Sequence, residues 1–196
     1  MSKTVEYFFD LGSPASYLAW TQLPDLCARH GAALVYRPML LGGVFQATGN
    51  ASPVMVPAKG RYMLADLQRF AARYGVTLAL PPGFPVNTLT LMRAVAGTQL
   101  SAPERFDDLL TALFTGLWVQ QRNLSEPGQL AQTLGEAGFD PDAFHALAGQ
   151  LEVKQALKRT TEEAVARGVF GAPTCFVGEQ MFFGQDRLDF VAQALA

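Results

Sequence analysis

The feature that most constrains the fold is a run of strand-forming residues that leads directly into the start of a helix. Residues 5–9 are rich in aromatic and β-branched side chains. In the turn that follows, Pro14 suits the first position of a helix, where its missing N–H costs nothing. Ser13 then falls at the N-cap, beside unpaired backbone N–H groups. A strand that ends at a helix N-terminus is a natural place to hold an anion.

A second strand signal, near the C-terminus, weighs against the simpler interpretation that Ser13 is only a helix cap. Pro173 opens the β-prone residues 174–177, and a two-residue turn separates them from the β-prone residues 180–183. A strand–turn–helix start with a distant Ala-Pro-Thr strand, hairpin and helix resembles the thioredoxin fold. Redox members of that fold carry Cys-x-x-Cys where this chain has Ser13 and Ser16.

The composition is typical of a globular protein. Of the 196 residues, 49% are apolar and 16% are charged, which fits one domain or one core with an insertion. A net charge of −2 and the lack of a Lys/Arg cluster argue against nucleic acid as a partner. No run reaches the ~18 apolar residues of a membrane helix, and no signal-peptide core stands at the N-terminus. We therefore expect a cytoplasmic protein with no membrane partner.

The cysteines and histidines give no sign of a disulfide or a metal site. Cys27 lies among leucines in the first expected helix, and Cys175 lies in an apolar strand. Both are expected to be buried and to act as small apolar side chains. His30 and His145 have no Cys or Asp spaced around them as metal ligands would be, so no metal site is predicted.

The expected elements place a helical block between two groups of strands. A helix over residues 14–30 separates the first strand from a second over residues 32–38, and such a long connection predicts parallel pairing. Residues 39–58 resemble a long loop. Further helices are expected over residues 60–74, from Asn87 to Gly97, from a capping box at Ser101 and Glu104 through residue 117, after Ser125, after Asp140, and over residues 151–167.

The strands then return as a hairpin over residues 174–183, with Asp186 suited to cap a terminal helix. The order β-α-β, several helices, then β-β-α predicts an α/β fold with a thioredoxin-like core and a large all-helical insertion. We expect residues 1–58 and 168–196 to form the core and residues 59–167 to form the insertion.

Six short motifs span the chain from Asp10 to Arg187 in order. They are Asp10-x-x-Ser13-Pro14-x-x-Tyr17, Leu41-Gly42-Gly43-x-x-x-x-Thr48-Gly49-Asn50, Pro57-x-Lys59-Gly60-x-Tyr62-Met63-x-x-Asp66-Leu67, Phe84-Pro85-x-Asn87-Thr88, Gly171-Ala172-Pro173-Thr174 and Phe183-Gly184-x-Asp186-Arg187. With these motifs the whole chain resembles the 2-hydroxychromene-2-carboxylate isomerases and the related kappa-class glutathione transferases, in the DsbA-like branch of the thioredoxin superfamily. The Leu-Gly-Gly and Phe-Pro-x-Asn-Thr motifs are more similar to the isomerase. Gly12 departs from the pattern, because such turns often carry a bulkier residue there.

The resemblance implies that glutathione is the cofactor and that the hydroxyl of Ser13 binds its sulfur. A free thiol has a pKa of about 8.5, and a helix N-terminus with a hydroxyl donor favours the thiolate. Serine replaces the protein's own nucleophile because the sulfur arrives with the cofactor. The other implied glutathione residues are Asn50, Lys59, Ala172, Pro173, Gln185 and Asp186.

Each of these residues also has a structural interpretation. Asn50 follows Gly49 as in an ordinary turn, Lys59 could be a solvated charge, and Asp186 could be a helix cap. In the resemblance, Asn50 contacts glutathione, Lys59 binds a carboxylate of glutathione or of the substrate, and Asp186 meets the γ-glutamyl ammonium. Ala172, before a proline that is cis in this fold, offers its backbone N–H and C=O to the cysteinyl part.

The implied reaction is a glutathione-dependent cis–trans isomerisation of 2-hydroxychromene-2-carboxylate to trans-o-hydroxybenzylidenepyruvate by transient thiolate addition. The partners are then a small aromatic acid, glutathione and a second copy of the chain in a homodimer. Four aromatic residues are expected to line the substrate pocket, although aromatic side chains more often belong to a core: Phe45, Tyr62, Phe84 and Trp118.

Other functions stay open. A kappa-like transferase would use the same glutathione site on an electrophile that keeps the sulfur, and a non-catalytic protein would bind glutathione without turnover. A thiol–disulfide oxidoreductase is disfavoured by the missing Cys-x-x-Cys motif. A serine hydrolase would need a base, and no His–Asp arrangement stands near Ser13 in the sequence.

Overall fold

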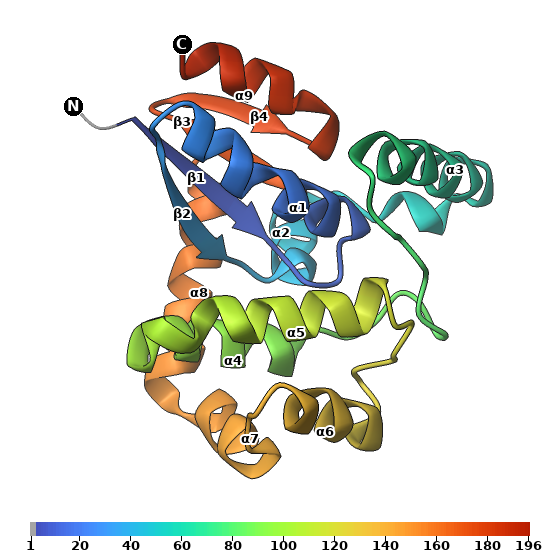
Figure 1. Cartoon of the computed structure of the whole chain (residues 1–196), viewed down its shortest axis with the longest axis vertical. Coiled ribbons are helices and arrows are strands. Elements are labelled where there is room, and N and C mark those ends of the chain that lie inside the picture. The colour runs from blue at the N-terminus through green and yellow to red at the C-terminus, as the bar shows by residue number, and fades with distance from the viewer. Residues whose placement is uncertain (1–2) are drawn as a thin grey trace.

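The computed structural model, which describes residues 3–196, has one mixed four-stranded sheet at its centre (Figure 1). The strands are β1 (Thr4–Phe9), β2 (Ala33–Pro38), β3 (Thr174–Val177) and β4 (Gln180–Phe183), in the spatial order β2-β1-β3-β4. β1 pairs with β2 in parallel and with β3 in antiparallel fashion, and β3 pairs with β4 as a hairpin. The predicted α/β core with β-α-β and β-β-α units is confirmed.

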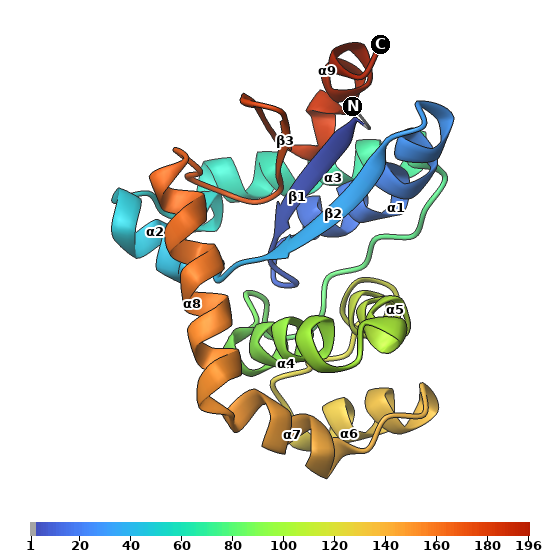
Figure 2. The same ribbon diagram turned by 90° about the vertical axis from the view of Figure 1, so that its left-hand side faces the viewer.

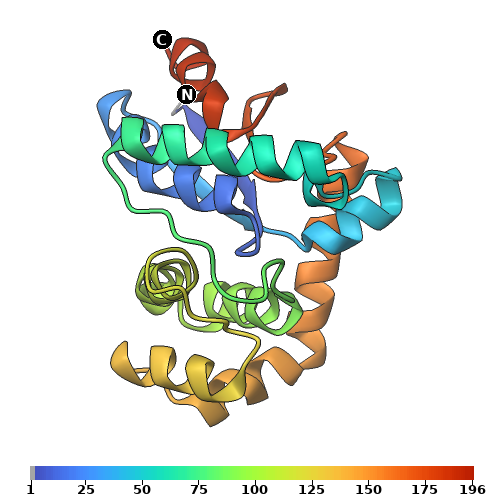
Figure 3. The same ribbon diagram turned by 90° about the vertical axis from the view of Figure 1, so that its right-hand side faces the viewer.

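The first helix, α1 (Pro14–Arg29), begins and ends where the sequence predicts. Pro14 occupies its first turn, and Gly31 stops it with a φ of +60°, a left-handed conformation that glycine adopts without a steric cost. Pro24 lies inside the helix on an exposed face. The helix covers one face of the sheet and connects β1 to β2, which places its N-terminus at the end of β1 (Figure 3).

The prediction of a long loop over residues 39–58 is wrong, because this segment contains helix α2 (Leu41–Thr48) and a 3₁₀ turn, η1 (Pro53–Met55). Two glycines near the helix start favoured a loop by propensity. Tertiary contacts overcome that preference: the Leu41 N–H donates to the buried carboxylate of Asp10 at 2.8 Å, and Val44 packs in the core. Gly49 ends the helix with a φ of +70°.

The remaining helices form a layer below the sheet and a cover above it. In Figures 1 and 2, α4 to α7 lie beneath the sheet, α3 lies beside α1, and α8 runs from the lower layer back to the sheet. The remaining elements are α3 (Pro57–Tyr74), α4 (Leu89–Ser101), η2 (Pro103–Arg105), α5 (Phe106–Trp118), α6 (Pro127–Glu136), α7 (Pro141–Gly149), α8 (Leu151–Ala166), η3 (Gln185–Arg187) and α9 (Leu188–Ala194). The boundary predicted between core and insertion, at residues 58 and 59, falls inside α3, and the division into core and insertion stays a prediction.

The apolar stripe predicted for α5 is buried along its whole length, but the helix boundaries before it differ from the prediction. Gly97 does not end α4; it lets Leu147 of α7 approach, since a Cβ there would lie 2.8 Å from the Leu147 Cγ. The capping box is wrong, because Ser101 is the last residue of α4 and its hydroxyl donates to the Gly97 carbonyl at 2.9 Å.

Of two further helix starts, the cap predicted at Ser125 is wrong and the start predicted at Asp140 is confirmed. Ser125 does not cap α6, whose first residue is Pro127, and its hydroxyl instead donates to the Asn123 side chain. Asp140 does cap α7, by accepting from the Asp142 N–H at 2.9 Å. No helix within residues 3–196 is long and apolar enough to cross a membrane.

Candidate active site

Ser13 lies at the N-cap of α1, as predicted, and joins two parts of the chain. Its Oγ accepts a hydrogen bond from the Ser16 N–H at 3.1 Å and donates to the Ala172 carbonyl at 3.0 Å. Ser13 as a whole residue is 4% exposed. The turn after β1 and the loop before β3 therefore meet at this hydroxyl, across 159 residues of sequence.

The loop that meets Ser13 contains the proline that the sequence singled out. The Ala172-Pro173 bond is cis, and Ala172 is half-buried. The Pro173 carbonyl accepts from the Gly184 N–H at 2.9 Å, which ties this loop to the end of β4. Pro173 thus stands at the first position before β3, and the Ala172 carbonyl faces Ser13 in the turn after β1.

Asp10 organises the turn, and the sequence analysis assigned it no role. Its buried carboxylate accepts from the Gly12 N–H at 2.8 Å, the Leu41 N–H at 2.8 Å and the Thr88 hydroxyl at 2.7 Å. Burial raises the pKa of the Asp10 carboxyl, and these three hydrogen bonds oppose that rise. One side chain therefore holds the turn, the start of α2 and the start of α4 together.

Gly12, the departure from the family pattern, is explained by a close approach. A Cβ at Gly12 would lie 3.1 Å from the Thr88 Cγ2 and 3.4 Å from the Asp10 Oδ1. A larger side chain would therefore press on the hydrogen bond between Thr88 and Asp10. Glycine leaves that bond undisturbed.

The other predicted glutathione residues are spread around the two loops. Asn50 is exposed and donates from its Nδ2 to the Phe170 carbonyl at 2.8 Å, two residues before Ala172. Lys59 is exposed in the first turn of α3, and within residues 3–196 no acidic group lies at ion-pair distance from it. No hydrogen bond or ion pair joins Lys59 to Ser13 in the described chain.

Gln185 and Asp186 lie in η3, after β4. The predicted N-cap at Asp186 is wrong, because the residue lies within η3 and α9 begins at Leu188 without a side-chain cap. The Asp186 carboxylate, which is one-third exposed, forms an ion pair with Arg187. Gln185 is buried, and its carbonyl accepts from the Tyr74 hydroxyl of α3 at 2.6 Å.

The four aromatic residues predicted to line a pocket do not form one group. Phe45 is half-buried on α2, and Tyr62 is 66% exposed on α3. Phe84 packs edge-on against Trp118, with ring centroids 5.8 Å apart. Trp118 is fully buried, and its indole N–H donates to the Leu11 carbonyl at 2.9 Å. Trp118 therefore supports the turn after β1 from the core and offers no surface to a ligand.

The protein's own thiols are remote from solvent. Cys27 and Cys175 are both free and buried, as predicted. Burial raises the pKa of the Cys27 thiol to about 11 and raises that of Cys175 further. Because the thiolate is the reactive form, neither cysteine is suited to act as a nucleophile at neutral pH. Within residues 3–196 no group of three His, Cys, Asp or Glu side chains could hold a metal ion.

We expect native protein at pH 7.5 to react with iodoacetamide at least about tenfold more slowly than unfolded protein, because both thiols are buried and protonated. Quantifying the alkylated cysteines by mass spectrometry checks this. The Cys27→Ala and Cys175→Ala double variant should keep the glutathione-dependent isomerisation that the resemblance implies, and loss of that activity with intact folding would implicate a protein thiol.

The comparisons with known proteins cover the whole chain. The model of the DSBA-like thioredoxin domain matches residues 4–196. A 2-hydroxychromene-2-carboxylate isomerase of Sphingobium xenophagum is 37% identical over 100% of this chain and 99% of that protein. Human glutathione S-transferase kappa 1 is 30% identical over 100% of this chain and 92% of that protein.

Solved structures agree with the sequence relatives. A 2-hydroxychromene-2-carboxylate isomerase structure superposes with a TM-score of 0.86 at 28% identity, covering 98% of this chain and 94% of that one. A probable DsbA oxidoreductase from Streptomyces coelicolor has a TM-score of 0.73 at 18% identity, over 98% of this chain and 88% of that one, and shows the shared fold alone.

Proposed function

The chain belongs to the DsbA-like thioredoxin domain family, among the 2-hydroxychromene-2-carboxylate isomerases and kappa-class glutathione transferases, and we propose that it is a glutathione-dependent isomerase. The proposed reaction converts 2-hydroxychromene-2-carboxylate to trans-o-hydroxybenzylidenepyruvate. The observation that carries this proposal is the Ser13 hydroxyl, 3.0 Å from the Ala172 carbonyl at the N-terminus of α1, in a protein whose own thiols are buried.

The residues around Ser13 fit a thiol tripeptide. Lys59 has no ion-pair partner within residues 3–196 and can meet a carboxylate, and the Asp186 carboxylate, which is paired with Arg187, can also meet an ammonium group. The Ala172 backbone would bind the cysteinyl part. In this proposal Asn50, Pro173 and Gln185 complete the glutathione site.

In this proposal the protein binds and orients the thiol of glutathione and favours its ionised form. The Ser13 hydroxyl hydrogen now points to the Ala172 carbonyl, and rotation about the Cβ–Oγ bond would direct it to a bound sulfur. The Ser16 N–H can remain on the Ser13 Oγ while this happens. The N-terminus of α1 adds a favourable field for an anion. Both effects lower the pKa of the bound thiol.

When bound, glutathione supplies a thiolate whose reversible addition to the conjugated double bond permits rotation about that bond before the thiolate leaves. The protein's residues hold the substrate in place beside Ser13 and exclude other orientations. Phe45, Tyr62 and Phe84 are the proposed aromatic contacts for the substrate, with Phe84 fixed by its packing on Trp118. We further propose a cytoplasmic homodimer.

A kappa-like transferase is the second candidate, since human glutathione S-transferase kappa 1 is 30% identical along nearly its whole length. The same glutathione site would then act on an electrophile that keeps the sulfur. A protein that only binds glutathione is a third candidate.

A turnover assay with 2-hydroxychromene-2-carboxylate, with and without glutathione, separates the three functions. We expect the trans product to accumulate only when glutathione is present, in catalytic amount, with no glutathione adduct detected by mass spectrometry. Stoichiometric consumption of glutathione with adduct formation would favour the transferase. Binding of glutathione without turnover of this acid or of a standard transferase electrophile would contradict both enzymatic functions.

A further inference from the structure

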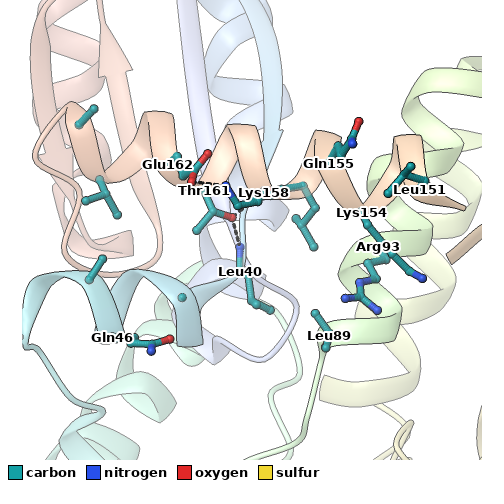
Figure 4. Close-up of a pocket in the computed structure, with 15 residues that line it drawn as sticks. Leu40, Gln46, Leu89, Arg93, Leu151, Lys154, Gln155, Lys158, Thr161 and Glu162 are labelled. Atoms are coloured by element: carbon teal, nitrogen blue, oxygen red, sulfur yellow. Dashed lines mark hydrogen bonds and ion pairs between the residues drawn. The ribbon is translucent and has the colours of Figure 1, made fainter. Parts of the chain in front are cut away.

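A cavity of about 730 Å³ lies between α2, α4 and α8, outside the proposed glutathione site (Figure 4). Its volume is within the range of about 300–1,000 Å³ that is typical of small-molecule sites. None of the residues assigned above to glutathione or to the aromatic substrate pocket lines it. Most of its wall is apolar and comes from Leu40, Gly43, Ala47, Leu89, Leu157 and Val165.

The charged groups of the cavity are unevenly placed. In Figure 4, Arg93 of α4 and Lys154 of α8 lie at one end of the cavity, and Glu162 lies about two turns further along α8 toward the other end. Glu162 forms an ion pair with Lys158, one turn before it on the same helix. The end with Arg93 and Lys154 is therefore positive, and the opposite end holds a neutralised pair.

Arg93 is half-buried, and no hydrogen bond or ion pair to it occurs within residues 3–196. This sets it apart from the other partly buried arginines of the described chain, each of which pairs with a carboxylate: Arg37, Arg105, Arg122 and Arg167. A guanidinium that is partly removed from water and lacks a partner strongly favours an anion, and its planar donors suit a carboxylate.

We propose that this cavity is a second binding site, which takes a small apolar monocarboxylate. The carboxylate lies on Arg93, with Lys154 beside it, and an aromatic ring or short hydrocarbon chain contacts Leu40, Leu89 and Leu157. A second carboxylate on the ligand would lie against the apolar wall formed by Leu40, Leu89 and Leu157, which disfavours dicarboxylates.

The site adjoins the catalytic turn without being part of it. Leu40 and Leu89 in the cavity wall are the chain neighbours of Leu41 and Thr88, which hydrogen-bond the Asp10 carboxylate. The proposal does not depend on glutathione chemistry. Its failure would leave the proposed function untouched, and its success would not establish that function.

Isothermal titration of the full chain with 2-naphthoate, in the absence of glutathione, tests the site. The uncharged 2-naphthamide is the matched probe, and we expect it to bind at least about tenfold more weakly, because it cannot form the charge-assisted contact with Arg93. Inorganic phosphate is a further probe, and binding of phosphate as tight as that of 2-naphthoate would contradict the apolar part of the proposal.

The Arg93→Gln variant should weaken 2-naphthoate binding by about tenfold to a hundredfold, as loss of a hydrogen bond between charged groups predicts. Arg93→Lys should recover part of the affinity. Arg159→Gln is the matched control, because Arg159 is an exposed arginine of α8 that does not line the cavity. If Arg93→Gln does not fold, Ala47→Phe tests the same site, because it fills the cavity from an exposed position of α2 and should also abolish binding.

Saturating S-hexylglutathione distinguishes this cavity from the glutathione site. We expect the dissociation constant of 2-naphthoate to stay the same in its presence. Displacement of the acid by S-hexylglutathione, equal affinity of wild type and Arg93→Gln, or no binding of 2-naphthoate would each overturn the proposal.

Discussion

Replacing Ser13 with alanine is expected to raise the pKa of the bound glutathione thiol by about one to two units and to lower turnover at neutral pH. The substitution removes a hydrogen bond to a charged sulfur, which contributes about 1.5–3 kcal/mol, and one pKa unit corresponds to about 1.4 kcal/mol. The N-terminus of α1 remains, so part of the thiolate stabilisation should persist. The thiolate absorbance of the complex, recorded against pH, measures the shift directly.

Turnover of the Ser13→Ala variant should recover in part at alkaline pH, where the thiol ionises without the hydroxyl. The variant also loses the side-chain cap of α1, at a cost of about 1 kcal/mol in the free energy of unfolding, so thermal melting must accompany the assay. Ser16→Ala is the matched control in the same turn. It removes a buried hydroxyl that has no partner within residues 3–196 and should leave stability and thiol pKa nearly unchanged.

An unchanged thiol pKa, combined with loss of turnover at every pH, would refute this role of Ser13. That result would favour Ser13 as a covalent nucleophile instead, and a trapped covalent adduct on Ser13 would then be detectable by mass spectrometry.

Asp10→Ala is expected to lower the free energy of unfolding by about 3–5 kcal/mol, because it leaves three donors in the core without their acceptor. Asp10→Asn should lower the free energy of unfolding by less, because the amide has the same shape as the carboxyl group and keeps one acceptor oxygen. Burial also disfavours the negative charge that this substitution removes. Denaturant unfolding of each variant measures these costs. Asp25→Ala, at an exposed position of α1, is the control and should change stability by less than about 0.5 kcal/mol.

The effect of Asp10 depends on pH with a defined sign. Burial raises the pKa of its carboxyl in the folded protein above the ordinary value of 3.8. The contribution of Asp10 to the free energy of unfolding is therefore fully present below pH 3.8, where the carboxyl is protonated. It is lost as pH rises through the raised pKa. The stability difference between wild type and Asp10→Ala should accordingly decrease as pH rises from about 4 toward 7. If the stability difference instead grows with pH over this interval, the three hydrogen bonds to Asp10 lower its pKa by more than burial raises it.

Much of the turn between β1 and α1 could be predicted because its signals are local. A strand-forming run, Ser13 at a cap position and Pro14 in the first turn specify a strand, a turn and a helix start within a dozen residues. The hairpin near the C-terminus has the same local character, since two β-prone runs flank a two-residue turn. The family resemblance then placed these pieces in one fold, which the structure has.

What the sequence could not predict depends on contacts between distant residues. Asp10 is an ordinary residue after a strand until Leu41 and Thr88, 31 and 78 residues later, bring their donors to it. Gly97 has the local signature of a helix end, and only the approach of Leu147 explains why the helix continues through it. The Arg93 cavity has no sequence motif, because α2, α4 and α8 each contribute only part of its wall.

The pairing of β1 with β3 means that the sheet can be completed only late in synthesis of the chain. β1 is a central strand, yet one of its edges has no partner until residues 174–177 have left the ribosome. Until then the nascent chain carries an open strand edge, which is a template for aggregation and a natural client surface for chaperones. The same late segment brings the Ala172 carbonyl to Ser13. A chain that stops before it therefore lacks both the β1–β3 pairing and the partner of the Ser13 hydroxyl.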